Sequence, residues 1–323
     1  MDSKQPTDPA IARDFALLDR EAGFCLLEDR LIVRMVGDDR VAFMHGMCTA
    51  NIKALRVGQV APALFLTDRA HLIADCFVYC LADALWLELN RALWPTLRAH
   101  LDRYLVADDV EMEEMAQLAV VALEGPRAAA ALGELGLAPP AVAWGWDTAG
   151  GLANLPRFGR PAFTAIVERA RWPELAARMR SVHCAELRPA TLEVIRVEQG
   201  LALVGVDTND RTLALEAAFQ REISFDKGCY IGQETVERAT ARGGIKRRLM
   251  GLRIAAEDLP PRGCRVLLDS APVGMLTSVV WSPRHAVIGL AILHHSAWTP
   301  GTVVSLELPA GALAATVVEV PFA

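Results

Sequence analysis

The last quarter of the chain carries the pattern that most constrains its fold. After Arg248 the sequence divides into six short apolar runs separated by glycine, proline and polar residues. Short runs joined by tight turns are typical of a small antiparallel β domain, because parallel strands need long crossovers. The predicted strands are Leu249–Ile254, Arg265–Leu268, Val273–Trp281, Ala286–Leu293, Val303–Leu308 and Ala314–Val320. We therefore place a domain boundary between residues 247 and 248.

Residues 1–247 mix predicted helices with predicted strands, which indicates an α+β region. Strands are expected at residues 31–36, 72–81, 85–89, 118–123 and 162–168, and helices at 40–47, 94–104, 127–135, 173–180 and 190–199. Residues 136–161 are rich in glycine and proline and read as a loop. Trp144 and Trp146 lie in this loop, either as anchors on the core or as a platform for a ligand, and both interpretations stay open.

Composition and cysteine usage limit the class of protein. A chain with 53% hydrophobic and 22% charged residues is not a disordered protein. It holds no apolar run of the roughly 18 residues that a membrane span needs, and its N-terminus lacks the basic start and apolar stretch of a signal peptide. Seven cysteines without CxxC spacing indicate reduced thiols. We expect a cytoplasmic protein with no membrane partner and no bound metal.

The net charge of −6 is unevenly distributed. The window from Lys227 to Arg253 carries +5, and the remainder of the chain carries −11. A basic patch on an acidic protein points to an anionic ligand or partner. The alternative is a solvated helix end and strand start, which needs no ligand.

The segment Ile223–Leu249 is the most informative for chemistry. Gly228 and Gly232 bracket Cys229, so the backbone can turn sharply there. The following run, 233–241, has the composition of a helix, and Cys229 would lie just before its N-terminus. Together with Lys227, that setting favours a thiolate. The competing interpretation is a small buried cysteine, and composition alone does not decide between them.

The run KGCYIGQE, Lys227–Glu234, resembles the signature of the YgfZ proteins, which are folate-binding relatives of the glycine-cleavage T-protein. Further segments resemble family motifs in the same order along the chain. They are FMHGMCTANI (43–52), LIADCFVY (72–79), LEGPRAAAAL (123–132) and RVEQGLALVGVD (196–207). The resemblance thus extends over nearly the whole chain.

The resemblance implies a three-lobed T-protein-like fold, with two intertwined α+β domains in residues 1–247 and a C-terminal antiparallel β-barrel in 248–323. It further implies a tetrahydrofolate-binding accessory factor for the assembly or repair of iron–sulfur proteins, including tRNA-modifying radical enzymes, with RNA reached only through those clients. By motif, Cys229 and Asp75 are the implied catalytic residues. The implied cofactor-binding residues are Glu198, Arg196, Lys227, Tyr230, Gln233, Glu234 and Arg242.

Two other functions compete with this hypothesis. The first is a folate-dependent aminomethyl- or methyl-transferase. Ala74-Asp75 stands where T-proteins carry two adjacent aspartates, and Asn51 stands where the family often has an acid, which weakens that case. The second is a scaffold whose folate site is vestigial. Both acids also have an interpretation that needs no ligand. Glu198 would then be a surface acid paired with an arginine, and Asp75 an acid at the end of a strand.

Overall fold

The computed structural model describes residues 8–241, 244–309 and 311–323. By its internal contacts the chain divides into two compact units, each built from distant parts of the sequence. Within the described residues, the first unit comprises 8–15, 190–220 and 234–323, and the second comprises 16–189 and 221–233. The sequence-based division after residue 247 stays a prediction.

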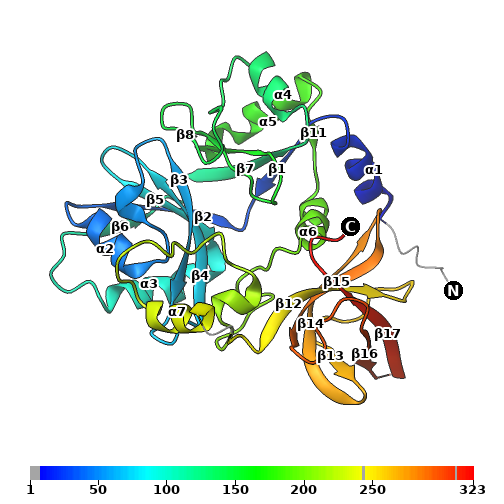
Figure 1. The fold of residues 1–323 in the computed structure, drawn as a ribbon. Helices are drawn as coiled ribbons and strands as arrows, with labels where there is room; N and C mark the ends of the chain where they lie inside the picture. The colour runs from blue at the N-terminus through cyan, green and yellow to red at the C-terminus, as the bar shows by residue number, and fades with distance from the viewer. Residues whose placement is uncertain (1–7, 242–243, 310) are drawn as a thin grey trace. The chain divides into compact units, whose positions relative to one another are not determined.

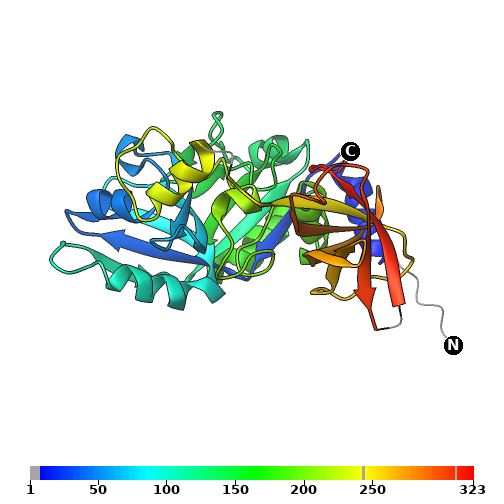
Figure 2. The same cartoon turned by 60° about the horizontal axis from the view of Figure 1, so that its bottom comes forward.

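The first unit contains a closed antiparallel barrel, drawn in yellow to red in Figures 1 and 2. Its strands follow the order β12-β15-β14-β13-β16-β17. They are β12 (Arg247–Ile254), β13 (Arg265–Leu268), β14 (Ala271–Ser282), β15 (Ala286–His294), β16 (Val303–Leu308) and β17 (Gly311–Val318). The six predicted strands are therefore confirmed. Helix α6 (Pro189–Glu198) and the short helix η4 (Ala214–Ala217) precede the barrel in the chain.

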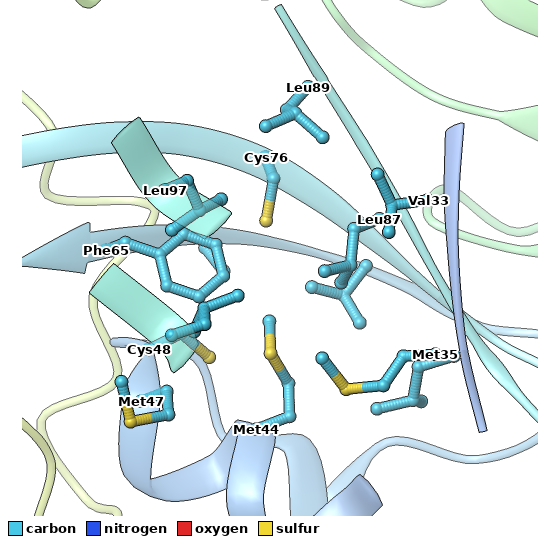
Figure 3. Close-up of a cluster of buried hydrophobic side chains, with 14 of the residues drawn as sticks. Val33, Met35, Met44, Met47, Cys48, Phe65, Cys76, Leu87, Leu89 and Leu97 are labelled. Carbon is cyan, nitrogen blue, oxygen red and sulfur yellow. The ribbon is translucent and has the colours of Figure 1, made fainter. Parts of the chain in front are cut away.

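The second unit contains a five-stranded sheet of order β3-β4-β5-β2-β6. The strands are β2 (Arg30–Val36), β3 (Val60–Leu66), β4 (Leu72–Cys80), β5 (Leu85–Asn90) and β6 (Glu111–Glu114). Helices α2 (Arg40–Met47) and α3 (Trp94–Asp102) pack on one face, where Met44 and Leu97 meet strand residues such as Phe65 and Cys76 (Figure 3). Every second residue of β4 enters this core, so Asp75 belongs to the opposite face.

A second sheet in the same unit has the order β11-β1-β7-β10-β9-β8. Its strands are β1 (Gly23–Leu27), β7 (Leu118–Glu124), β8 (Trp146–Asp147), β9 (Leu152–Asn154), β10 (Phe163–Glu168) and β11 (Ala185–Glu186). Helices α4 (Ala128–Glu134) and α5 (Trp172–Ser181) cover one face. A cluster containing Ile32, Tyr79, Val120 and Trp146 joins the other face to the five-stranded sheet.

Several elements were not predicted from the sequence, among them the strands β1, β6 and β11 and the helix α1 (Pro9–Leu18). The short helices η1 (Ile52–Ala54), η2 (Arg91–Leu93) and η3 (Arg169–Arg171) join longer elements, and α1 (Pro9–Leu18) and α7 (Gln233–Ala241) complete the set. The predicted loop 136–161 contains β8 and β9, whose two and three residues are too short to show periodicity. Strand β3 was missed because Pro62 interrupts its pattern; β3 is an edge strand, where proline is tolerated.

Candidate functional site

The signature segment is held on the second unit by Lys227. Its buried ammonium group donates hydrogen bonds to the carbonyl oxygens of His45, Cys48 and Ala50, at 2.5, 2.7 and 2.7 Å. An ammonium group has three donors, so all of them are used. Burial lowers the pKa of Lys227. This geometry gives Lys227 a structural role in holding the segment, and its predicted role as a ligand-binding residue stays a prediction.

The turn between Lys227 and α7 requires glycine at one of its two glycine positions. Gly232 has φ of +86°, and a Cβ there would lie 2.6 Å from the carbonyl oxygen of Thr67. At Gly228 the nearest atom would be 4.0 Å from an added Cβ, an ordinary contact. Tyr230 is buried, and its backbone N–H donates to Oε1 of Gln233 at the start of α7. Tyr230 and Gln233 thus shape the turn, and their predicted contact with a cofactor stays a prediction.

Cys229 lies exposed on this clamped segment. The other cysteines are all less accessible: Cys25, Cys48, Cys76, Cys80 and Cys184 are buried, and Cys264 is half-buried. Burial raises the pKa of Cys48 to about 11 and that of Cys184 to about 12. Since the thiolate is the reactive form, these two thiols are inert at neutral pH. The signature cysteine is therefore the thiol most available to a partner or reagent.

The charged residues that follow the turn, in α7 and the basic window, have different surroundings. Glu234 is exposed at the start of α7 and forms an ion pair with Arg238 one turn later, as a solvated helix face does. Arg242 lies outside the described residues, so its predicted role stays a prediction. In the basic window, Arg247 pairs with Glu216 and Arg248 with Glu319, so part of the +5 charge is neutralised locally.

Asp75 occupies the middle of β4, directly opposite Leu64 of β3. The residue is half-buried, but its Oδ1 atom is fully buried and has no hydrogen-bond partner among the described residues. Burial raises the pKa of Asp75, while the cations of Arg30 and Arg157 act in the opposite direction. A protonated carboxyl can donate as well as accept a hydrogen bond. Asp75 is thus equipped to hold a proton at an unpaired position.

Glu222 is a further acid of this region, and the sequence reasoning missed it. Its carbonyl oxygen accepts the Thr49 hydroxyl at 2.5 Å, and that hydroxyl oxygen accepts the N–H of Leu64 at 2.9 Å. Thr49 therefore ties the segment carrying Glu222 to the strand opposite Asp75. Burial, together with the charge of Asp75, raises the pKa of Glu222. The sequence offers one signal for Glu222, which is an acid directly before the segment Ile223–Leu249 that carries the signature motif.

Replacing Asp75 by asparagine should stabilise the fold at pH 8 and flatten its pH dependence. A carboxyl whose pKa is raised on folding binds its proton more tightly in the native state, so stability falls as pH rises above the unfolded value of about 4. Urea unfolding at pH 5 and pH 8 measures this slope. Asp68→Asn, at an exposed position in the turn after β3, is the matched control. Equal pH slopes in wild type and Asp75→Asn would contradict the assignment.

In the first unit, Arg196 has a structural role, because its guanidinium group bonds only to other parts of the protein. Its guanidinium group, buried, donates to both carboxylate oxygens of Glu193, to the Leu201 carbonyl, to Asp207 and to Ser278. These five bonds use all five donors of an arginine. Arg196 therefore joins α6 to the 201–207 loop and to β14, and its predicted contact with a cofactor is not favoured by this geometry.

Glu198, two residues further along α6, is different. It is buried, and its carboxylate accepts one hydrogen bond from Ser282 Oγ at 2.6 Å and one from Arg284 at 3.3 Å. Ser282 Oγ in turn accepts the backbone N–H groups of Arg284 and His285, which fixes its position. A carboxylate has about four acceptor positions. Glu198 is thus oriented by the protein and retains capacity for two further donors.

Neither a metal centre nor a membrane-spanning helix is found in the described part of the chain. No group of three or more histidine, cysteine, aspartate or glutamate side chains is placed to hold a metal ion among residues 8–241, 244–309 and 311–323. In the same residues, no helix has the length and apolar character to cross a bilayer.

Comparison with known proteins places this architecture among described families. Residues 3–153 match the GCVT N-terminal domain, and residues 247–323 match the glycine cleavage T-protein C-terminal barrel domain. The glycine cleavage system aminomethyltransferase T from Bartonella henselae shares the fold, with a TM-score of 0.87 at 20% identity over 97% of this chain and 89% of that one. The fold class inferred from the sequence motifs is confirmed.

Two sequence relatives carry transferase names. A protein of Arabidopsis thaliana named "Putative transferase At1g60990, chloroplastic" is 28% identical over 258 residues, which is 76% of this chain. The chain covers 59% of that protein's length. An aminomethyltransferase of Nostoc sp. is 26% identical over 313 residues, covering 88% of this chain and 80% of the relative.

Proposed function

Because the chain belongs to the glycine-cleavage T-protein-like superfamily, we propose that it is a reduced-folate-binding accessory factor for the assembly or repair of iron–sulfur proteins, including tRNA-modifying radical enzymes. The observation that carries this proposal is the exposed thiol of Cys229 on a segment clamped by Lys227. A segment fixed by three charge-assisted bonds presents its thiol in a defined position, as a transient contact with a client's cluster or cysteine requires.

Glu198 is the residue we assign to the folate. A reduced pterin presents an edge of several N–H donors, and the two open acceptor positions of the Glu198 carboxylate fit two of them. When bound, tetrahydrofolate supplies a reductant, a one-carbon acceptor or an organising ligand. The role of this chain is to orient the carboxylate through Ser282 and Arg284 and to keep it out of water.

Glu198→Gln should weaken tetrahydrofolate binding by about 1 to 3 kcal/mol, because the amide nitrogen would face a pterin donor and leave it unpaired. Isothermal titration with tetrahydrofolate measures the change. Glu257→Gln, at an exposed position after β12 in the same unit, is the control and should bind as wild type does. Equal affinity in wild type and Glu198→Gln would remove Glu198 from the folate site.

The second candidate function is folate-dependent aminomethyl transfer. It is supported by the names of the relatives and by the unpaired, buried Oδ1 of Asp75, which could exchange a proton with a substrate. The lone aspartate at Ala74-Asp75 argues against it. The two functions separate in a host that lacks the gene. Loss of activity in a tRNA-modifying iron–sulfur enzyme with normal glycine cleavage supports the accessory factor, and the reverse pattern supports the transferase.

A further inference from the structure

The face of the five-stranded sheet that carries Asp75 also carries a second acid, the buried Glu88 of β5. Cys76 and Leu87 project into the core drawn in Figure 3, so their chain neighbours Asp75 and Glu88 project from the other face. In the register of β4 and β5, Glu88 lies directly opposite Phe77, which is two residues along from Asp75. Residues in this diagonal arrangement lie about 7 to 8 Å apart. Glu88 is therefore a close neighbour of Asp75.

Glu88 binds two arginines whose side chains are buried. Its Oε1 accepts Nε of Arg30 at 2.8 Å and lies 2.8 Å from Nη1 of Arg157, while its Oε2 accepts Nη2 of Arg157 at 2.9 Å. The backbone carbonyl oxygen of Glu88 accepts a further bond from Arg30 at 3.2 Å. The Arg157 guanidinium also lies 4.9 Å from the centre of the Phe77 ring and donates to the Thr164 hydroxyl. Both guanidinium groups are thus held by Glu88.

Asp75 receives no hydrogen bond from either arginine in the described part of the chain. Its Oδ1 atom is buried without a partner there, and so is the Nε atom of Arg157. A buried carboxylate without a partner is costly, so burial favours the neutral carboxyl. Burial raises the pKa of Asp75, and the charge of Glu88 adds to this effect, whereas the charges of Arg30 and Arg157 lower the pKa.

The charged side chains around Asp75 come from four parts of the second unit. Among the described residues, Arg30 comes from β2, Glu88 from β5, Arg157 from the loop after β9, and Glu222 from the segment before the signature motif. Both cations are bonded to Glu88. Glu222 is an acid, and the charge of Asp75 contributes to raising its pKa. None of these groups therefore gives Asp75 a paired positive charge.

We propose that Glu88 is a positioning residue of the Asp75 site, because it holds Arg30 and Arg157 by its own carboxylate and so keeps the Asp75 carboxyl neutral. A neutral carboxyl can donate a proton, whereas a carboxylate paired with an arginine is only an acceptor. Glu88 thereby sets which form of Asp75 a bound folate meets. The placement of Asp75 in a folate site rests on the proposed function.

The test is a carboxyl ¹³C NMR titration of the full chain, with the Asp75 resonance assigned by its loss in Asp75→Asn. In wild type, Asp75 should titrate above the ordinary aspartate value of 3.8. In Glu88→Gln both guanidinium groups lose their counter-ion and are free to pair with Asp75, so its titration should move to lower pH. Glu113→Gln removes an acid from the surface of the same sheet and should leave the Asp75 titration unchanged. An unchanged Asp75 titration in Glu88→Gln overturns the proposal.

Two further variants keep the test decisive should Glu88→Gln not fold. Arg157→Gln leaves Glu88 paired with Arg30 and removes one cation, so Asp75 should titrate at higher pH than in wild type. Tyr79→Phe removes the hydroxyl that Glu88 accepts at 2.6 Å but changes no charge, so it should lower stability and leave the Asp75 titration in place. An Asp75 titration that moves in Tyr79→Phe but not in Arg157→Gln would give Glu88 a merely structural role and overturn the proposal.

Failure of this role for Glu88 is distinguishable from failure of the proposed function, because the NMR titration needs neither folate nor a client protein. Isothermal titration of wild type with tetrahydrofolate reports on the function alone. If Asp75 shifts as expected and no tetrahydrofolate binds, the folate function fails and the role of Glu88 stands. If tetrahydrofolate binds and the Asp75 titration does not shift in Glu88→Gln, the role of Glu88 fails and the folate function stands.

Discussion

Replacing Glu88 by glutamine should lower the free energy of unfolding by about 3 to 5 kcal/mol, because it leaves two buried guanidinium groups without their counter-ion. Glu88 Oε1 lies 2.8 Å from Arg30 and 2.8 Å from Arg157, and Oε2 accepts the Tyr79 hydroxyl at 2.6 Å. All four side chains are buried in the second unit, with Glu88 completely inaccessible. Because the groups are buried, removing one partner leaves uncompensated charge out of water and lowers the free energy of unfolding strongly.

The pH dependence of Glu88 has the opposite sign to that of Asp75. The two arginines, opposed by burial, lower the pKa of Glu88 to about 2 from an ordinary value of 4.5. A depressed pKa contributes stability above the unfolded value, and that stability is lost as pH falls from about 4.5 towards 2. Glu88→Gln should therefore remove much of the wild-type loss of stability in this acid range, while Asp75→Asn should remove a loss that begins as pH rises above about 4.

Chemical denaturation of wild type and Glu88→Gln at pH 7 and pH 3 measures both effects. Glu113→Gln is the matched control, because Glu113 pairs with Arg34 across 3.9 Å at the surface of the same sheet. A surface pair contributes about 0 to 1 kcal/mol, so the control should unfold close to wild type. Similar losses in the two variants would show that the buried network has no special role in holding the sheets together.

The fold could be predicted where local chemistry decides it. The six barrel strands are bounded by glycine, proline and polar turns, and the structure places each of them within a few residues of its predicted range. Strands β1 and β3 were not predicted. β1 has only five residues and β3 is interrupted by Pro62, so neither shows enough alternation of apolar and polar residues. Their assignment depends on neighbouring strands that are distant in the sequence.

The candidate site was predictable as a set of positions but not as a set of roles. Sequence motifs located Lys227, Arg196 and Glu198. The sequence alone does not show that Lys227 and Arg196 use all their hydrogen-bond donors within the protein, whereas the Glu198 carboxylate keeps open acceptor positions. That distinction depends on long-range contacts, such as the carbonyls of residues 45–50 for Lys227 and Ser278 for Arg196. Glu88 offered one signal, since an acid inside the apolar run LWLELN must find a partner when buried.

Cys229→Ser should abolish support of an iron–sulfur client while leaving the fold intact. The side chain is exposed, so the substitution removes little packing, and its effect on unfolding should stay within about 0.5 kcal/mol. Complementation in a host that lacks the native factor, read as the activity of a tRNA-modifying iron–sulfur enzyme, measures the loss. Cys264→Ser, at the half-buried cysteine of the barrel unit, is the matched control and should complement fully.

Alkylation order tests the chemical basis of that prediction independently of any client. With iodoacetamide at neutral pH, Cys229 should react first and Cys264 second, because the five remaining thiols are buried and burial raises the pKa of Cys48, Cys76, Cys80 and Cys184. Mass spectrometry of each cysteine peptide over time gives the order. Slow modification of Cys229 together with full complementation by Cys229→Ser would remove the thiol from the mechanism. The case would then depend on the folate contact of Glu198, and the aminomethyl-transfer function would become the stronger candidate.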